Sequence, residues 1–286
     1  MADNRTILVT GATGKQGGAV IRALTGKSFR LRAMTRKPES DAAKAIAATG
    51  AEIITGDLDD ADSLRRALAG AWGVFAVQNT WEAGVEREEE QGKRLAQLAR
   101  DAGVQHYVYS SVGSAHRKTG IPHFDNKWRV EETVRGLTFP SHVIIRPVFF
   151  MENVMTPWFL NGDKLYVAMK PETSLQMIAV EDIGRYHARA FTDAAALNGR
   201  EIDIAGDAAT MPQTAATLSE ALGRNIEFVR IPIEDVRKNS ADMAAMLEWF
   251  DRVGYNADIP GLEREFGITA MRLRDWATRS LTGARR

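Results

Sequence analysis

The sequence predicts an α/β protein of the doubly wound type, in which helices cover both faces of a parallel sheet. Two observations in the first half of the chain lead to this prediction. Short apolar segments alternate with segments of helical spacing, as expected when strands buried on both faces are joined by helices. A glycine-rich turn follows the first apolar segment directly. Right-handed connections between successive parallel strands would then place helices on both faces of the sheet.

Six segments of the first half are predicted to be strands, and five segments between them are predicted to be helices. The strands are Thr6–Thr10, Leu31–Met34, Glu52–Thr55, Gly73–Val77, His106–Ser110 and His142–Ile145. The helices are Gly17–Leu24, Ala42–Ala48, Ala61–Leu68, Glu86–Ala102 and Phe124–Val134. Glycines stand where these helices should end, and Asp60 and Asp62 lie where negative charge favours the start of the third helix.

The regular alternation stops after Ile145. Residues 147–178 contain three prolines and an Asn-Gly pair, which indicates loops and short strands. The predicted elements beyond them are a helix at Val180–Phe191, a strand at Glu201–Ala205, a helix at Pro212–Leu222, a strand at Ile226–Ile231 and mostly helix from Ile233. We therefore predict a nucleotide-binding core over residues 1–150 and a small C-terminal α/β subdomain over 151–286, parts of which return to the core.

Composition narrows the classes of function. The 286 residues include 37 basic and 37 acidic side chains, so no positive surplus favours nucleic acid or an anionic membrane as a partner. The absence of cysteine excludes disulfides and thiolate chemistry, and five scattered histidines do not suggest a metal site. No apolar run is long enough to span a membrane. We expect a cytoplasmic protein, a monomer or homodimer, without a metal.

The turn after the first strand carries the strongest local signal. Gly11, Gly14 and Gly17 have the spacing G-x-x-G-x-x-G within TILVTGATGKQGGAV, between a strand and a helix. The first glycine permits a tight turn, the second lets backbone amides approach a pyrophosphate, and the third lets the helix pack closely. The N-terminus of the helix adds free N–H groups and a positive dipole end. This turn predicts dinucleotide binding on a Rossmann-type sheet.

The ends of the next strands indicate which dinucleotide binds. The second strand ends at Arg36 and Lys37, where an NAD-binding protein would carry a carboxylate for the ribose hydroxyls. Since a guanidinium can bind a 2′-phosphate with two hydrogen bonds, we predict NADP(H) as the cofactor. Asp57 ends the third strand near the expected adenine, and Gln78 and Asn79 end the fourth.

With GATGKQGGAV, TRKP, GDLDD, YVYSSV, HFDNKW and IIRPVFFMEN together, the chain resembles the NmrA-like family of atypical short-chain dehydrogenase/reductases. It resembles most the subgroup of NADPH sensors. The resemblance implies a Rossmann core, NADP(H) binding and a small subdomain that closes over the nicotinamide. The cofactor contacts that it implies are Gly11, Thr13, Gly14, Lys15, Gln16, Gly17, Arg36, Lys37, Asp57, Leu58, Gln78, Asn79, Lys93, Lys127, Phe150, Met151, Glu152 and Asn153.

The chain departs from ordinary short-chain dehydrogenases at the catalytic position. Those enzymes use a serine with a Tyr-x-x-x-Lys pair, in which the lysine lowers the pKa of the proton-exchanging phenol. Here His123 and Lys127 have that spacing, and Ser111 stands at the end of the fifth strand. These three residues are the predicted catalytic groups. The helix around Glu88 and Lys93 carries many charges, which we interpret as solvated pairs.

Two classes of function follow from this departure. The first is a redox sensor, in which NADP(H) occupancy shifts an equilibrium that a partner protein detects. The second is an NADPH-dependent oxidoreductase that transfers a hydride directly to a quinone or a conjugated carbonyl. Its substrate would be a small aromatic or quinone-like molecule. The subgroup resemblance favours sensing, the wider superfamily favours reduction, and the sequence leaves both open.

Overall fold

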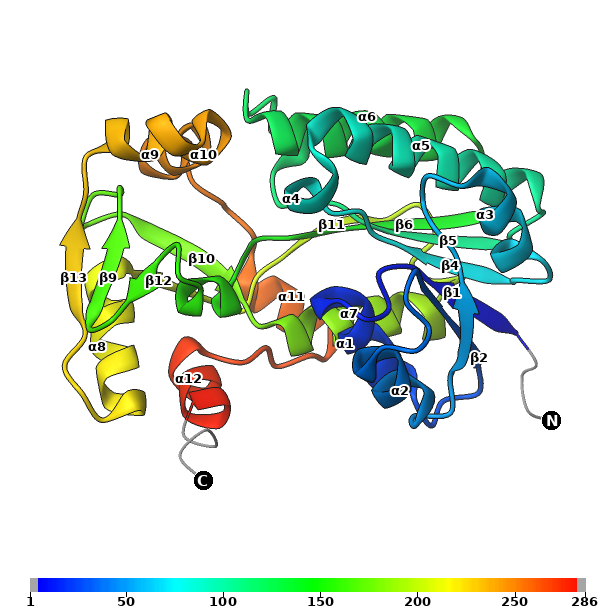
Figure 1. Cartoon of the computed structure of the whole chain (residues 1–286), viewed down its shortest axis with the longest axis horizontal. Helices are drawn as coiled ribbons and strands as arrows, with labels where there is room; N and C mark the ends of the chain where they lie inside the picture. The colour runs from blue at the N-terminus through cyan, green and yellow to red at the C-terminus, as the bar shows by residue number, and fades with distance from the viewer. Residues whose placement is uncertain (1–4, 282–286) are drawn as a thin grey trace.

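A seven-stranded sheet forms the centre of the molecule, which is a computed structural model that describes residues 5–281 (Figure 1). All its strands are parallel, in the order β11-β6-β5-β4-β1-β2-β3. Their bounds are β1 Thr6–Val9, β2 Arg30–Thr35, β3 Glu52–Thr55, β4 Gly73–Ala76, β5 His106–Ser110, β6 Ser141–Pro147 and β11 Glu201–Ile204. The strand order reverses between β1 and β4, and doubly wound folds bind ligands at the carboxyl ends of the strands beside such a switch point.

Helices cover both faces of this sheet. One face carries α1 (Lys15–Leu24), α2 (Asp41–Ala47), α7 (Val180–Thr192) and α11 (Ile259–Phe266), which share one buried apolar cluster. The other face carries α3 (Ala61–Leu68), α5 (Val85–Asp101) and α6 (Pro122–Gly136) over a second cluster. This arrangement confirms the predicted doubly wound fold.

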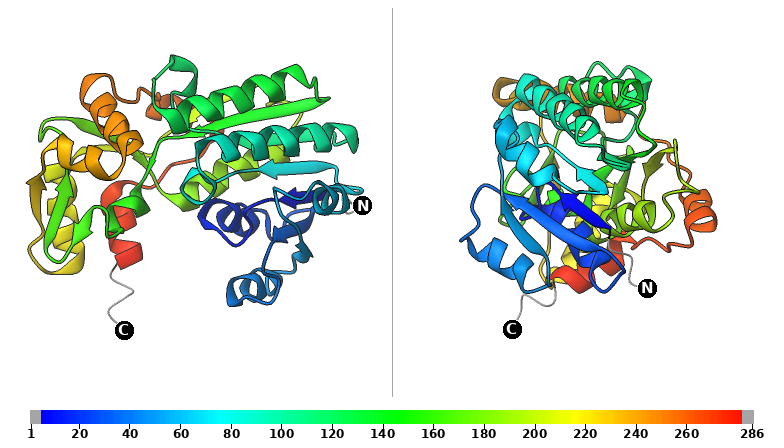
Figure 2. Two further views of the ribbon diagram at one scale, coloured as in Figure 1. Left: turned by 45° about the horizontal axis from the view of Figure 1, so that its top comes forward. Right: turned by 90° about the vertical axis from the view of Figure 1, so that its right-hand side faces the viewer.

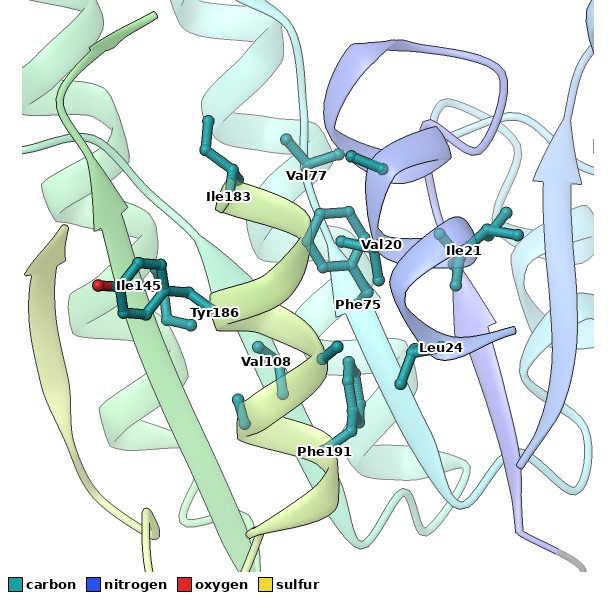
Figure 3. Packing of buried hydrophobic residues seen from close by; sticks show 14 of the residues in the cluster. Val20, Ile21, Leu24, Phe75, Val77, Val108, Ile145, Ile183, Tyr186 and Phe191 are labelled. Carbon is teal, nitrogen blue, oxygen red and sulfur yellow. The ribbon is translucent and has the colours of Figure 1, made fainter. Parts of the chain in front are cut away.

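The first apolar cluster joins α1 and α7 to the sheet. Figure 3 shows Val20 and Ile21 of α1 and Ile183 of α7 packed over strand residues such as Phe75. The two helices approach so closely that a Cβ atom on Gly184 would lie 2.5 Å from the carbonyl oxygen of Ala19. Only a glycine fits at that position, so the contact fixes how α1 and α7 sit against each other.

A smaller lobe follows the sheet in the chain. Its strands form two three-stranded sheets, β12-β10-β7 and β13-β9-β8. They are β7 Phe149–Phe150, β8 Leu160–Asn161, β9 Lys164–Val167, β10 Ser174–Ile178, β12 Asp207–Thr210 and β13 Glu227–Arg230. Its helices are α8 Met211–Leu222, α9 Ile233–Asn239, α10 Ala241–Arg252, α12 Leu273–Leu281 and the 3₁₀ segment η2 Met151–Met155.

The lobe lies at the carboxyl ends of the central strands, as Figures 1 and 2 show from three sides. Strand β6 leads directly into β7 of the lobe, and β11 leads into β12. Because all seven strands are parallel, the carboxyl ends of β1 and β4 lie on the same side of the sheet as the lobe.

The strands and helices predicted before Ile145 are all present, with ends that differ by at most two residues. Asp60 caps α3 as expected, because its carboxylate accepts hydrogen bonds from the backbone N–H groups of Asp62 and Ser63. Two short elements were not predicted, α4 (Thr80–Ala83) and the 3₁₀ turn η1 (Ala115–Arg117). Among residues 5–281, no helix is both long and apolar enough to cross a membrane.

Two buried histidines help to hold α7 on the sheet. His106 of β5 lies 3.0 Å from the carbonyl oxygen of Ala190 through Nε2, and His187 of α7 meets the ring of Phe75 edge-on. Both side chains are fully buried. Burial lowers the pKa of each imidazole to about 4, because a charged ring would lose its water. Both rings are therefore neutral in the folded protein at pH 7.

Acid should destabilise the protein partly through His187. In the unfolded chain a histidine gains its proton below about pH 6.5, whereas the folded protein resists protonation down to about pH 4. Stability is therefore lost as the pH falls through this window, by about 2 kcal/mol for this residue at pH 5. Urea unfolding at pH 8 and pH 5 should show a smaller loss in His187→Leu than in the unaltered protein. An equal loss of stability in both proteins would show that His187 does not contribute to the acid destabilisation.

Candidate functional site

The turn between β1 and α1 is closed by a backbone hydrogen bond. The N–H of Gly14 donates to the carbonyl oxygen of Gly11 at 2.9 Å, and Gly11 has a φ of +57°, in the left-handed region that favours glycine. A Cβ atom on Gly17 would lie 2.3 Å from that same carbonyl oxygen. The three predicted glycines therefore let α1 begin directly at the end of β1.

The first turn of α1 is open to an anion. Gly14 is the N-cap residue, and no side chain accepts a hydrogen bond from the first N–H groups of the helix. No acidic residue lies in this turn, whereas Lys15 adds a positive charge. Thr13 is exposed beside it, and Gln16 accepts a 2.6 Å hydrogen bond from Ser110 of β5. Free amides at a helix N-terminus are suited to bind a phosphate group.

The end of β2 places Arg36 and Lys37 at the surface, at the same edge of the sheet as the carboxyl ends of β1 and β4. The guanidinium of Arg36 forms an ion pair with Glu82 of α4. This hydrogen bond raises the pKa of Arg36. Asp57, after β3, is half-buried, and its carboxylate accepts a 3.0 Å hydrogen bond from the N–H of Asp59.

Two more of the predicted cofactor contacts, Leu58 after β3 and Lys93 on α5, interact with charged side chains of α5. Leu58 is half-buried, and its carbonyl oxygen accepts a 2.8 Å hydrogen bond from Arg94. Lys93 forms a 2.6 Å ion pair with Glu89, one turn earlier on α5. The side chain of Leu58 packs against the apolar cluster under α3 and α5.

The end of β4 contains an unpaired amide. Gln78 is 5% exposed, and neither its side-chain oxygen nor its nitrogen has a hydrogen-bond partner among the described residues. A buried amide without partners is costly, and most such groups in native proteins are satisfied by protein, water or a ligand. Asn79 beside it is exposed and caps α4, because its side chain accepts a hydrogen bond from the N–H of Trp81. The amide of Gln78 lies toward Gly92 of α5, because a Cβ atom on that glycine would be 3.2 Å from the amide oxygen, and no described group satisfies it.

The three predicted catalytic residues are each engaged by a carboxylate. The hydroxyl of Ser111 donates to Glu131 at 2.5 Å, in a site that is 4% exposed. The Nδ1 atom of His123 lies 2.6 Å from Asp242 of α10. These two contacts hold Ser111 against α6 and join His123 to the lobe.

Lys127 is the third of these residues. Its Nζ atom lies 2.7 Å from a carboxylate oxygen of Glu88, which is 1% exposed. The other oxygen of Glu88 accepts a 2.7 Å hydrogen bond from Asn126. Our interpretation of this helix as a row of solvated pairs is wrong for Glu88, which faces inward between α5 and α6.

The segment after β7 contributes one structural carboxylate. Glu152 accepts hydrogen bonds from the N–H of Val180, at the start of α7, and from the indole N–H of Trp276 in α12, at 3.0 and 3.1 Å. Burial raises the pKa of this carboxyl group. Met151 is fully buried, whereas Phe150 and Asn153 are half-buried. Glu152 thus ties the segment to two helices.

The NmrA-like family model matches residues 3–280. The chain belongs to the NmrA-like family. An NmrA-like family domain-containing protein of Dictyostelium discoideum is 25% identical over 274 residues, which cover 88% of this chain and 89% of that one. The chain spans about half the length of several other relatives, which are named as NmrA-like family domain-containing oxidoreductases.

Two solved structures share the fold of this NmrA-like protein. One is NmrA, a negative transcriptional regulator, in complex with NAD, with a TM-score of 0.81 and 21% identity over 98% of this chain and 96% of that chain. The other is an NADPH-dependent quinone oxidoreductase of Escherichia coli complexed with NADPH, with a TM-score of 0.80 and 23% identity over 96% and 99%. At this level of identity the likeness concerns the fold.

The sequence did not identify the carboxylates that hold the predicted groups of this NmrA-like protein. Glu82, Glu88 and Asp242 each come from an element other than that of their partner. Residues 123 and 242 are 119 positions apart, so no local spacing could reveal their contact. In the described residues, no three His, Cys, Asp or Glu side chains are arranged as a metal site.

Replacing Gly17 by alanine should displace the turn. The new methyl group would collide with the backbone at Gly11, which we expect to lower the free energy of unfolding by about 1–3 kcal/mol. Gly136→Ala is the matched control, because nothing lies within 4 Å of a Cβ atom at that helical position. Equal stability of the two variants in urea would show that α1 does not approach the turn as closely as described.

Proposed function

We propose that this NmrA-like protein binds NADP(H) at the carboxyl ends of β1, β2 and β4 and acts as a redox sensor or regulator with little or no turnover. The observation that carries the proposal is that the hydroxyl of Ser111 is donated to Glu131 and that Lys127 is paired with Glu88, so neither group is free to move a proton. A sensor needs a binding site and an equilibrium that binding shifts, and it needs no group that is free to move a proton.

Four features support the dinucleotide. The glycine turn places open helix amides at the switch point of the sheet, where ligands of doubly wound folds bind. Arg36 and Lys37 extend from the adjacent strand, and Gln78 supplies an unpaired amide. Structures of the same fold hold NAD or NADPH. The observed groups therefore fit the phosphates and the polar edge of such a cofactor.

In this proposal the protein groups have separate tasks. The first amides of α1 bind the pyrophosphate, and Arg36 binds the 2′-phosphate with Lys37 beside it. Lys127, oriented by Glu88, binds the ribose next to the nicotinamide. When bound, the nicotinamide supplies a hydride for two-electron reduction.

Slow turnover follows from the state of the possible proton donors. The hydroxyl of Ser111 is already donated to Glu131. Tyr109 is fully buried in β5, and burial raises the pKa of its phenol well above the ordinary value, so it cannot replace the missing catalytic tyrosine. Loss of general acid catalysis typically slows a reaction by about 10²–10⁴-fold.

A second function has one observation in its favour. The Nδ1 atom of His123 lies 2.6 Å from Asp242, an arrangement that orients an imidazole for proton transfer through Nε2. With such a donor the protein would be an NADPH-dependent oxidoreductase, which transfers the hydride directly to a quinone or a conjugated carbonyl.

The cofactor preference depends on Arg36. We expect Arg36→Ala to weaken NADPH binding by about tenfold to a hundredfold and to leave NADH binding nearly unchanged, because a charged phosphate contact contributes about 1.5–3 kcal/mol. Arg30→Ala is the control, since Arg30 is exposed at the other end of the same strand. Titration calorimetry with both dinucleotides measures these affinities. Equal affinity of the unaltered protein for NADPH and NADH would refute NADP(H) specificity.

A turnover assay separates the two functions. Purified protein is incubated with NADPH and a panel of quinones, conjugated carbonyls and dyes while nicotinamide absorbance is followed, and sedimentation measures association with and without NADPH. We expect tight binding, slow or no oxidation and a change in compactness or association on binding. Turnover faster than about one per second would identify a reductase instead. His123→Ala would then remove most of the activity if His123 is the proton donor.

A further inference from the structure

Helix α4 is a single turn between β4 and α5, and three consecutive side chains on it contact different parts of the candidate site. Thr80 donates its hydroxyl to Glu88, the carboxylate that holds Lys127. Trp81 packs on His123, and Glu82 pairs with Arg36. This one turn therefore contacts Arg36, the group proposed for the 2′-phosphate, the carboxylate that holds Lys127, and the histidine that is joined to the lobe.

The pair between Glu82 and Arg36 has a direct consequence for the 2′-phosphate. Both side chains are half-exposed, at 53% and 56%, so either can move. The pair with Glu82 uses Nη2 of Arg36, so a phosphate that binds the guanidinium through Nη2 with two parallel hydrogen bonds takes the place of Glu82. The remaining carboxylate would also repel the phosphate at short range. NADH lacks this phosphate, so it can bind while Arg36 stays paired with Glu82.

Trp81 connects α4 to the lobe through His123. Its ring lies 5.3 Å from that of His123, measured between centroids. On the other side of His123, Nδ1 is 2.6 Å from Asp242 in the first turn of α10. The side chains of His123 and Asp242 are only 10% and 17% exposed, so this contact is well shielded from water. A shift of α4 would therefore act on a buried junction between α6 and the lobe.

The ends of α4 allow the turn to move as a unit. Asn79 caps its start, and Gly84 follows its end with a φ of +83°. Nothing lies within 4 Å of a Cβ atom at Gly84, so the chain is not packed there. Trp81 is 60% exposed, one of the few large apolar side chains at the surface of the described residues.

We propose that Glu82 sets the preference between NADPH and NADH by competing with the 2′-phosphate for Arg36, and that α4 transmits its release through Trp81 and His123 to Asp242 of the lobe. This inference rests on the proposed function, because it takes Arg36 as the phosphate ligand. It adds the group that the phosphate displaces and the route by which the lobe responds. NADPH breaks the ion pair, whereas NADH leaves α4 in place.

The first experiment measures the affinities of Glu82→Gln. The amide keeps the size of the side chain and removes its charge, so we expect NADPH to bind about two- to fivefold more tightly, as expected for release of one exposed ion pair. NADH affinity should not change. Glu90→Gln, an exposed carboxylate on α5, is the matched control and should behave as the unaltered protein. An unchanged ratio of the two affinities in Glu82→Gln would overturn the proposal.

The second experiment follows the route to the lobe by hydrogen exchange of backbone amides. NADPH should change exchange in residues 80–84 and in the first turn of α10, and NADH should change neither. In His123→Phe, which keeps an aromatic ring but loses the bond to Asp242, NADPH should still affect α4 and no longer affect α10. A response of α10 to NADH equal to that to NADPH, or an unaltered response in His123→Phe, would overturn the route.

The two proposals fail in different ways. If Arg36→Ala leaves NADPH affinity unchanged, the phosphate site itself is wrong. If Arg36→Ala weakens NADPH binding but Glu82→Gln does not alter the ratio of affinities, the site stands and only the competition by Glu82 is refuted.

Discussion

The close approach of α1 to the backbone of the first turn is the constraint on which the rest of the structure depends. Gly17 lets the helix pass within contact distance of Gly11, and Gly184 lets α7 pass equally close to Ala19 on the other side. Helix α1 is thus held between the turn and α7. Since α7 begins directly after β10 of the lobe and its first N–H group, on Val180, donates a hydrogen bond to Glu152, the phosphate-binding end of α1 and the lobe share one rigid helix pair.

A second theme is the pairing of candidate groups with carboxylates from other elements. The pairs are Arg36 with Glu82, Lys127 with Glu88, Ser111 with Glu131 and His123 with Asp242. The pairs inside the protein must persist, because a buried charge that loses its partner costs several kcal/mol. The pair at the surface is weak, at about 0–1 kcal/mol, and an incoming phosphate can replace it. This contrast lets the pair at the edge of the site open while the pairs inside the protein stay formed.

The sequence predicted the parts of the molecule that repeat or are local. Apolar strands, helical spacing and the glycine turn each depend on neighbouring residues, and the structure confirms the fold that they indicate. Helix α4 was missed because four residues are too few to show a period. Glu88 was taken as solvated because its neighbours are charged, although α6 covers it. The contact of His123 with Asp242 depends on tertiary packing, which no local spacing encodes.

A crystal structure of the protein with NADPH would test the account most directly. The account predicts the pyrophosphate on the first amides of α1, the 2′-phosphate on Arg36, and Glu82 separated from that guanidinium with α4 displaced. NADPH bound away from the carboxyl ends of β1 and β4, or bound there with Arg36 still paired to Glu82, would contradict it.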